Sequence, residues 1–225
     1  MTPAIEAIIF DMDGLLVDSE IYWEEARRDY SSDHDCEWTP QDELAVKGNN
    51  SAEWAEAIRR RCQLAVPPDV IIDGVVRRMR ALYDRRLPLL PGATEIVPQL
   101  ASGYPLAIAS SSPVTLIEYV MTLAGLRDCF TVAVSADEVG RGKPAPDVFL
   151  EAARQLGHPP DRCAVFEDST AGIAAGRAAG MFVIAVPNPH YPPSPEVLQQ
   201  ADIVLGSLTQ FRLSMLTTRI NDRSS

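Results

Sequence analysis

Basic residues and histidine are scarce in this sequence of 225 residues. Lys and Arg together number 20 against 31 Asp and Glu, and there are 3 His, so the formal net charge is −11. A chain this acidic is a poor partner for the phosphates of DNA or RNA or for an anionic membrane, so we expect neither partner. The sequence also lacks any apolar run that approaches the length of a membrane span.

Cysteine is also rare, and its four positions follow no recognisable pattern. Cys36, Cys62, Cys129 and Cys163 lie far apart without any CxxC spacing. We therefore expect reduced thiols in a cytoplasmic protein, and neither a disulfide framework nor a zinc site. The first fourteen residues contain no Lys or Arg and several acidic residues, which is unlike an ordinary secretory signal peptide.

Lysine is the scarcest of the charged residue types. Of the 20 basic residues, only Lys47 and Lys143 are lysines, and all the others are arginines. Chance is the simple explanation for this bias. The alternative is that these two positions need a compact, flexible point charge, which a planar guanidinium does not provide.

Short apolar segments alternate with segments of helical periodicity along most of the chain. We expect strands at residues 5–10, 105–109, 131–134, 163–166, 182–186 and 203–205, and helices at 93–101, 113–124, 147–156 and 170–179. This alternation predicts an α/β fold, a Rossmann-like parallel sheet with helices on both faces. Ligands of such sheets bind outside the carboxyl ends of the strands.

The first two strands are too far apart for a single crossover connection. Nearly a hundred residues separate them, whereas a parallel connection needs about a dozen. The apolar residues between them recur with helical spacing, for example at Trp23, Ala26 and Tyr30. We therefore predict an α-helical cap domain at residues 20–87, inserted into a catalytic core formed by residues 1–19 and 88–225.

Two carboxylates follow the first strand directly, in the run Asp11-Met12-Asp13-Gly14. Asp11 could attack phosphorus as a nucleophile, and Asp13 could give and take the protons. Gly14 allows a sharp turn of the backbone. The motif alone is weak evidence, because many such pairs are solvated turn residues.

Polar residues also follow other predicted strands or precede helices. Ser110 and Ser111 could bind an anion, Lys143 could neutralise a phosphoryl oxygen, and Glu167 with Asp168 could bind Mg²⁺. Each also has a simpler structural explanation: the serines and Asp168 could cap helices, and Lys143 could be a solvated loop residue.

Taken together and in this order, the four elements resemble the haloacid dehalogenase superfamily. The resemblance rests on FDMDG at 10–14, Ser110 after an apolar strand, Lys143 in GKPAPD, and FEDS at 166–169. It covers nearly the whole chain. The helical-cap subfamily, and its β-phosphoglucomutase-like and sugar-phosphate phosphatase branch, is the most similar, since the run DMDGLLVDSE at 11–20 is characteristic of that branch.

The resemblance implies a role for each matching residue. Asp11 would be the nucleophile that becomes an aspartyl phosphate, and Asp13 the general acid and base. Ser110, the N–H group of Ser111 and Lys143 would bind phosphate next to Gly14. The resemblance also implies Mg²⁺ as cofactor, with a metal site formed by Asp11, the backbone carbonyl of Asp13, Asp168 and, through water or a second layer of contacts, Glu167.

The cap departs from the pattern of the mutases in this branch. Trp23 stands where the mutases carry a histidine, and no arginine follows Lys47-Gly48-Asn49. Both differences favour hydrolysis over phosphate transfer within a sugar. We expect Lys47, Trp23 and Asn49 to contact the substrate, although a solvated lysine and a core tryptophan are the simpler alternatives.

Arginine clusters in the cap leave a further possibility open. Arg59, Arg60 and Arg61 form one cluster, and Arg77, Arg78 and Arg80 form another. Most of these are expected on solvent-facing surfaces of helices, because charge runs usually are. One of the second cluster could still reach the substrate, and the sequence does not choose among them.

We therefore predict a Mg²⁺-dependent, monomeric phosphatase that hydrolyses a small sugar or polyol phosphate through an aspartyl-phosphate intermediate. A β-phosphoglucomutase-type phosphotransferase is the first alternative. An inactive scaffold with a binding or regulatory role is an alternative of another class. Dehalogenase and phosphonate-cleaving activities are less favoured, because Asp13 is present.

Overall fold

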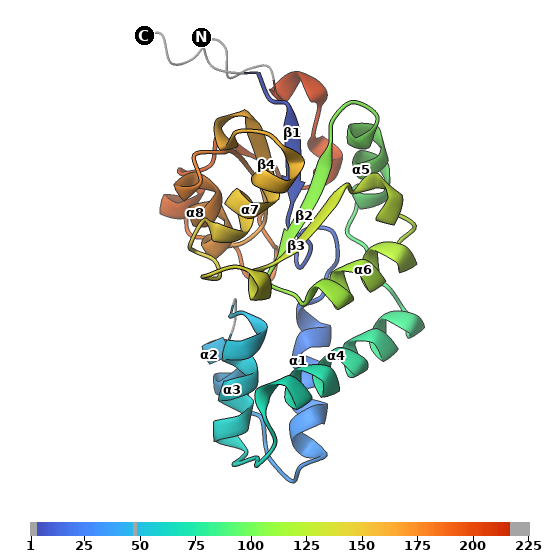
Figure 1. The fold of residues 1–225 in the computed structure, drawn as a ribbon, viewed down its shortest axis with the longest axis vertical. Helices are drawn as coiled ribbons and strands as arrows, with labels where there is room; N and C mark the ends of the chain where they lie inside the picture. The colour runs from blue at the N-terminus through green and yellow to red at the C-terminus, as the bar shows by residue number, and fades with distance from the viewer. Residues whose placement is uncertain (1–3, 47–48, 217–225) are drawn as a thin grey trace.

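Hydrophobic strand segments assemble into one parallel sheet in the computed structural model, which describes residues 4–46 and 49–216 (Figure 1). Within these residues the sheet has 6 strands in the order β3-β2-β1-β4-β5-β6, and every neighbouring pair is parallel. The strands are β1 (Ala7–Phe10), β2 (Leu106–Ser110), β3 (Val132–Ser135), β4 (Cys163–Glu167), β5 (Phe182–Ala185) and β6 (Ile203–Val204). The α/β fold predicted from the sequence is confirmed.

Alternate residues of each central strand pack against different helices. Ile8 and Phe10 of β1 belong to a core shared with α5 (Ala93–Ala101) and α6 (Val114–Leu123). Ala7 and Ile9 face the opposite side, toward the helices α7 (Asp147–Leu156) and α8 (Thr170–Ala178). Because side chains alternate across a strand, a continuously apolar strand is buried on both faces of the sheet.

The chain between β1 and α5 is helical. It forms α1 (Glu20–Ser32), α2 (Pro40–Val46), α3 (Ser51–Arg61) and α4 (Pro68–Arg85). In Figure 1 these helices lie together beyond the end of the sheet at which β1 leads into α1. Both α1 and α3 pack against α4. That residues 20–87 form a separate domain with these boundaries stays a prediction.

Several hydrogen bonds join this helical layer to the rest of the molecule, among them one from α3 and one from α4. The Ser51 N–H group at the start of α3 donates to Asp137 Oδ1 over 2.8 Å. The Arg80 guanidinium of α4 donates to the carbonyl oxygen of Thr115 in α6 over 2.9 Å. The helical layer is therefore held over the carboxyl ends of the strands, where ligands of parallel sheets bind.

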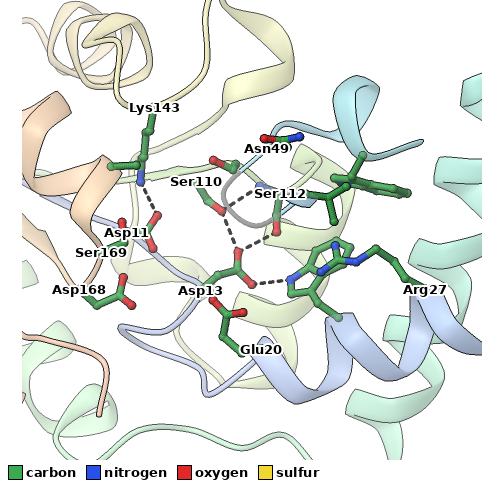
Figure 2. A pocket seen from close by; sticks show the side chains of 15 residues that line it. Asp11, Asp13, Glu20, Arg27, Asn49, Ser110, Ser112, Lys143, Asp168 and Ser169 are labelled. Atoms are coloured by element: carbon green, nitrogen blue, oxygen red, sulfur yellow. Dashed lines mark hydrogen bonds and ion pairs between the residues drawn. The ribbon is translucent and has the colours of Figure 1, made fainter. Parts of the chain in front are cut away.

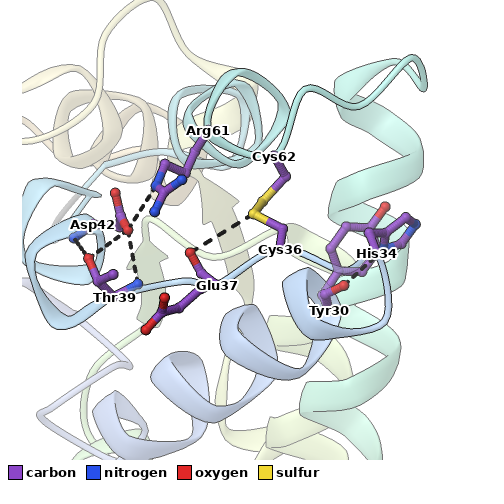
Figure 3. The surroundings of a disulfide bond; sticks show 8 residues. All are labelled: Tyr30, His34, Cys36, Glu37, Thr39, Asp42, Arg61 and Cys62. Carbon is purple, nitrogen blue, oxygen red and sulfur yellow. Dashed lines mark hydrogen bonds and ion pairs between the residues drawn. A yellow bond between two sulfur atoms is a disulfide. The ribbon is translucent and has the colours of Figure 1, made fainter.

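The cysteine prediction is wrong for two of the four residues (Figure 3). Cys36 and Cys62 form a disulfide, with their Cα atoms 5.4 Å apart, while Cys129 and Cys163 are free thiols. Cys36 follows the end of α1 and Cys62 directly follows α3. The two helix ends meet because both helices pack on α4, a relationship that cysteine spacing alone does not reveal. The expectation of four reduced thiols, which was one reason for predicting a cytoplasmic location, is therefore not met.

Short elements complete the described chain. They are α9 (Pro195–Leu198) and the 3₁₀ turns η1 (Arg127–Cys129), η2 (Ala136–Glu138), η3 (Pro160–Arg162), η4 (Leu208–Gln210) and η5 (Leu213–Leu216). Among the residues that the structure describes, no helix combines the length and the apolarity needed to cross a bilayer.

Candidate active site

The carboxyl ends of β1, β2 and β4 deliver polar side chains to one pocket (Figure 2). These three strands are direct neighbours in the sheet, so the residues that follow them lie side by side. The pocket has a volume of about 110 Å³. Its described lining consists of Asp11, Asp13, Glu20, Trp23, Arg27, Val46, Asn49, Trp54, Ser110, Ser111, Ser112, Lys143, Asp168, Ser169 and Ala171.

Lys143 lies between two buried carboxylates. Its Nζ atom donates to Asp11 Oδ1 over 2.6 Å and to Glu167 Oε1 over 2.5 Å, and also to the Ala109 carbonyl oxygen over 3.2 Å. Its side chain is 6% exposed. The lysine therefore reaches from its loop into the pocket and is not a solvated surface residue.

Asp13 is surrounded by hydrogen-bond donors from both sides of the pocket. Its Oδ2 atom accepts from Ser110 Oγ at 2.9 Å and from Ser112 Oγ at 2.7 Å. Its Oδ1 atom accepts from the indole nitrogen of Trp23 at 3.0 Å. These contacts fix the carboxylate in one orientation, with the serines on the sheet side and the indole on the helical side.

Gly14 allows the chain to pass close to Asp168. Its φ angle is +84°, in the region that favours glycine. A Cβ atom at this position would lie only 2.3 Å from Asp168 Oδ2. Glycine is therefore required both for the turn after Asp13 and for the approach of Asp168 to Asp11.

Asp11, Glu167 and Asp168 form a buried acidic cluster whose carboxylate oxygens lie within 4.8 Å of one another. Glu167 Oε2 already accepts from the backbone N–H groups of Asp168 and Ser169 and from Ser169 Oγ, at 2.9, 3.0 and 3.0 Å. Asp168 Oδ1, by contrast, is buried and has no hydrogen-bond partner among the described residues.

Burial dominates the electrostatics of this cluster. Burial, and then the charges of Glu167 and Asp11, raise the pKa of Asp168 well above its ordinary value. Burial also raises the pKa of Asp11. The charge of Lys143 lowers this pKa, whereas the charges of Glu167 and Asp13 raise it further. Burial lowers the pKa of Lys143, but Asp11 and Glu167 more than offset this and raise it.

A divalent cation fits this donor set. A buried carboxylate oxygen without a partner beside further carboxylates is the oxygen-rich environment that Mg²⁺ prefers. Asp11 and Asp168 have coordination capacity on the pocket side. Glu167 is committed to Lys143 and to the backbone after β4, so its main effect is on the orientation of these groups.

The helical layer contributes the other half of the pocket. Glu20, Trp23 and Arg27 of α1 line it, as do Asn49 and Trp54. The polar edge of Trp23 is directed at Asp13, so its indole N–H is committed within the protein. Asn49 lies at the pocket as predicted for a substrate contact, and its role stays a prediction. Lys47 lies outside the described residues.

Sequence reasoning missed Glu20, Arg27 and Trp54 as pocket residues. The sequence spacing could have indicated two of them. Glu20 precedes Trp23 by three residues, and Arg27 follows it by four. Residues with this spacing share one face of a helix. Arginine is rarely buried, so the residue type itself gives no indication that Arg27 faces a pocket.

The arginine clusters of the cap do not line this pocket. Arg59 and Arg60 pair with Glu56, and Arg61 pairs with Asp42. In the second cluster, Arg78 pairs with Asp33 and Arg80 contacts α6. The pocket arginine of the helical layer is therefore Arg27, which lies in neither cluster.

Comparison with known proteins identifies the family. A family model described as haloacid dehalogenase-like hydrolase matches residues 5–180. The bifunctional riboflavin kinase/FMN phosphatase of Arabidopsis thaliana is 35% identical over 208 residues, which cover 92% of this chain but only 54% of that protein. The chain thus spans about half the length of that relative.

A second relative and a solved structure match over almost their whole length. Hexitol phosphatase B of Escherichia coli K12 is 35% identical over 219 residues, covering 92% of this chain and 94% of that protein. The crystal structure of CbbY from Rhodobacter sphaeroides in complex with phosphate superposes with a TM-score of 0.83 at 27% identity, covering 95% and 99% of the two chains. The chain therefore belongs to the haloacid dehalogenase-like hydrolase family.

Proposed function

We propose that this hydrolase removes phosphate from a small sugar or polyol phosphate with the help of Mg²⁺. It is a phosphoric monoester hydrolase. The observation that carries the proposal is the arrangement around Asp11 and Asp13, two carboxylates on one pocket wall with Lys143 on one side and the Ser110–Ser112 segment on the other. A nucleophile, an acid, a cation and hydroxyl donors converge there, as phosphoryl transfer requires.

Asp11 is the nucleophile in this proposal. A carboxylate oxygen of Asp11 attacks phosphorus, the bond from phosphorus to the leaving oxygen breaks, and an aspartyl phosphate forms. Lys143, 2.6 Å from Asp11, holds the carboxylate in place and offsets negative charge on the phosphoryl oxygens. Ser110 and Ser111, at the end of β2, bind the same oxygens.

Asp13 moves the protons. It gives a proton to the leaving oxygen as the first bond breaks, so that an alcohol departs. It then takes a proton from water as that water attacks phosphorus, the bond to Asp11 breaks, and inorganic phosphate leaves. Trp23 and Ser112 support this role, because they can keep its carboxylate oriented in both steps while the hydroxyl proton of Ser110 turns from Asp13 to the phosphoryl oxygens.

Mg²⁺ would be held by side-chain oxygens of Asp11 and Asp168 and, as the family resemblance implies, by the backbone carbonyl of Asp13. Bound there, it would reduce the repulsion between an anionic nucleophile and an anionic phosphate. Asp168 supports this site because its Oδ1 atom is buried without a partner among the described residues. Glu167 positions Lys143 and the backbone after β4.

The names of the relatives support the proposed substrate class. One relative is named a hexitol phosphatase and the other an FMN phosphatase, and the phosphate of FMN is attached to a ribityl chain. Both names therefore point to a phosphate on a polyol chain. The cytoplasmic location and the monomeric state expected from the sequence stay predictions.

The experiment that tests this proposal is phosphate release from a panel of sugar and polyol phosphates, with Mg²⁺ and with chelator. Metal-dependent release supports the phosphatase. Adding β-glucose 1-phosphate with a bisphosphate primer tests the mutase alternative, since formation of glucose 6-phosphate without phosphate release would replace hydrolysis by transfer. Lack of turnover with every compound would favour the inactive scaffold.

A further inference from the structure

An arginine lies on the helical side of the pocket, where the part of a substrate remote from phosphorus would be. Arg27 is only 6% exposed and lines the same pocket as Asp11 and Asp13. In Figure 2 its side chain runs from α1 toward the indole that contacts Asp13. Arginine is almost never this buried without a specific partner.

The guanidinium of Arg27 is held on several sides. Its Nε atom donates to Glu43 Oε2 over 3.0 Å, and its Nη2 atom donates to Glu43 Oε1. Glu43 is itself fixed by the indole nitrogen of Trp38, over 2.9 Å. The guanidinium also lies over the rings of Trp23 and Trp54, at 5.2 and 5.9 Å from their centroids. This donor is therefore preorganised, and its side-chain entropy is already lost before a ligand binds.

The third nitrogen of the Arg27 guanidinium and the negative charges around it determine which ligand groups it can bind. The third nitrogen, Nη1, makes no hydrogen bond to any residue that the structure describes, so its N–H groups can donate to a ligand oxygen. The bidentate ion pair with Glu43 compensates the positive charge of the guanidinium. A further acidic residue, Glu20, lines the same pocket. Counted over the described lining residues, the site therefore offers hydrogen bonds without an excess of positive charge.

We propose that Arg27 determines the specificity of the hydrolase by donating hydrogen bonds to an uncharged hydroxyl or carbonyl oxygen at the end of the substrate opposite to the phosphate. The ion pair with Glu43 makes the same site disfavour a second phosphate at that end, because the paired guanidinium offers a dianion little net positive charge. The preferred substrates are thus monophosphates of hydroxylated chains, and bisphosphates are rejected. This inference rests on the proposed function.

The contacts between the two ends of the pocket support this assignment. Asp13, which protonates the leaving oxygen, is 3.0 Å from the indole nitrogen of Trp23. Arg27 lies over the ring of the same tryptophan. One indole ring therefore lies between the acid and the guanidinium, and all three groups line the same pocket. In the proposed binding mode, the carbon chain extends along this ring and places its distal oxygen at Arg27.

Mannitol 1-phosphate and mannitol 1,6-bisphosphate form a matched pair for the first test. Because mannitol has twofold symmetry, both phosphates of the bisphosphate are equivalent, and the two compounds differ only at the distal end. p-Nitrophenyl phosphate, which lacks hydroxyl groups, is the reference substrate. Ratios of kcat/KM measured within one preparation do not depend on the fraction of protein that is folded.

We expect the Arg27→Gln variant to lower kcat/KM for mannitol 1-phosphate relative to p-nitrophenyl phosphate by about ten- to a hundredfold, the effect of losing hydrogen bonds from a charged donor. Arg60→Gln is the matched control, since Arg60 is paired with Glu56 on the exposed face of α3, and it should leave the ratio unchanged. An Arg27→Gln ratio within about twofold of wild type overturns the inference.

Glu43→Gln tests the charge compensation separately. Wild-type protein should prefer mannitol 1-phosphate over the bisphosphate by about tenfold or more, and the Glu43→Gln variant should narrow this preference by about fivefold or more. A wild-type preference for the bisphosphate overturns the inference while the proposed function survives. If wild-type protein turns over none of the three compounds, the proposed function fails and the inference fails with it.

Discussion

The indole nitrogen of Trp23 and the carboxylate of Asp13 lie 3.0 Å apart, and this hydrogen bond joins the helical layer to the strand ends. Trp23 belongs to α1, whereas Asp13 follows β1. Asp13 is at the same time bound by Ser110 and Ser112 at the end of β2. The orientation of the proposed acid and base therefore depends on how the helices sit over the sheet.

We expect Trp23→Phe, which keeps an aromatic ring but removes the N–H donor, to lower kcat by roughly tenfold with a smaller change in KM. The reason is that Asp13 loses one of the three donors that orient it. Tyr22→Phe is a suitable control, because it removes one hydrogen bond from the neighbouring residue of α1 to the Arg86 carbonyl oxygen. Steady-state kinetics of both variants check this, and equal kcat losses would contradict the role of Trp23.

Replacement of Asp168 by Asn should stabilise the protein in the absence of metal. Burial and the neighbouring carboxylates raise the pKa of Asp168, so its ionised form is unfavourable in the folded state. We expect Asp168→Asn to raise the free energy of unfolding in chelator by about 1 to 3 kcal/mol, measured by urea denaturation. Mg²⁺ should stabilise wild-type protein but not the variant. Destabilisation of the metal-free variant would show that Asp168 has a structural role instead.

Gly172 of α8 lies directly against Glu167, and a Cβ atom there would be 1.7 Å from Glu167 Oε1. Gly172→Ala should therefore displace Glu167 and disturb the position of Lys143. We expect the free energy of unfolding to fall by about 1 to 3 kcal/mol and most of the phosphatase activity to be lost. Gly103→Ala is the control, since no atom lies within 4 Å of its Cβ position. Thermal unfolding and phosphate release measure both effects. Wild-type activity of Gly172→Ala would contradict the role assigned to Glu167.

The disulfide predicts the number of reactive thiols. Burial is the main cause that raises the pKa of the Cys163 thiol to about 11, and the charges of Asp161 and Glu6 add to it. Very little of this thiol is ionised at pH 8, so Cys163 in folded protein should react slowly with a thiol reagent at that pH. Unfolded protein without reductant should show the 2 free thiols Cys129 and Cys163, and 4 after reduction. Four thiols before reduction would contradict the disulfide.

The same bond should contribute to stability. A crosslink between residues 26 positions apart stabilises by about 3.5 kcal/mol according to loop entropy. We expect the Cys36→Ser, Cys62→Ser double variant to lose an amount of this order in urea denaturation. Cys129→Ser, which removes a free thiol outside the disulfide, is the control. A double variant as stable as wild type would mean that the bond does not form in solution.

Much of the sheet side of the site could be predicted because it depends on local order along the chain. Each strand is a short apolar run, and the polar residue after it must lie at the carboxyl edge of a parallel sheet. Asp11, Ser110 and Glu167 could thus be grouped from the amino-acid sequence alone. Their roles came from the family resemblance, since the residues by themselves left helix capping as an alternative.

The helical side could not be predicted in the same way. The pairing of Arg27 with Glu43 joins α1 to α2, and the Cys36–Cys62 bond joins the end of α1 to the end of α3. Both depend on how the helices pack, and periodicity shows only which face of a helix is apolar. The direction of the Trp23 indole toward Asp13 likewise depends on the position of α1 over the sheet.

The most direct test of the central claim is phosphate release from a hexitol phosphate by wild-type protein and by Asp11→Asn, each with Mg²⁺ and with chelator. Asp11→Asn keeps the shape of the side chain, so circular dichroism should show an unchanged fold. We expect release by wild-type protein only with Mg²⁺, and a rate at least about a thousandfold lower for the variant. A variant that releases phosphate at the wild-type rate, or wild-type release that is indifferent to chelator, would contradict the account.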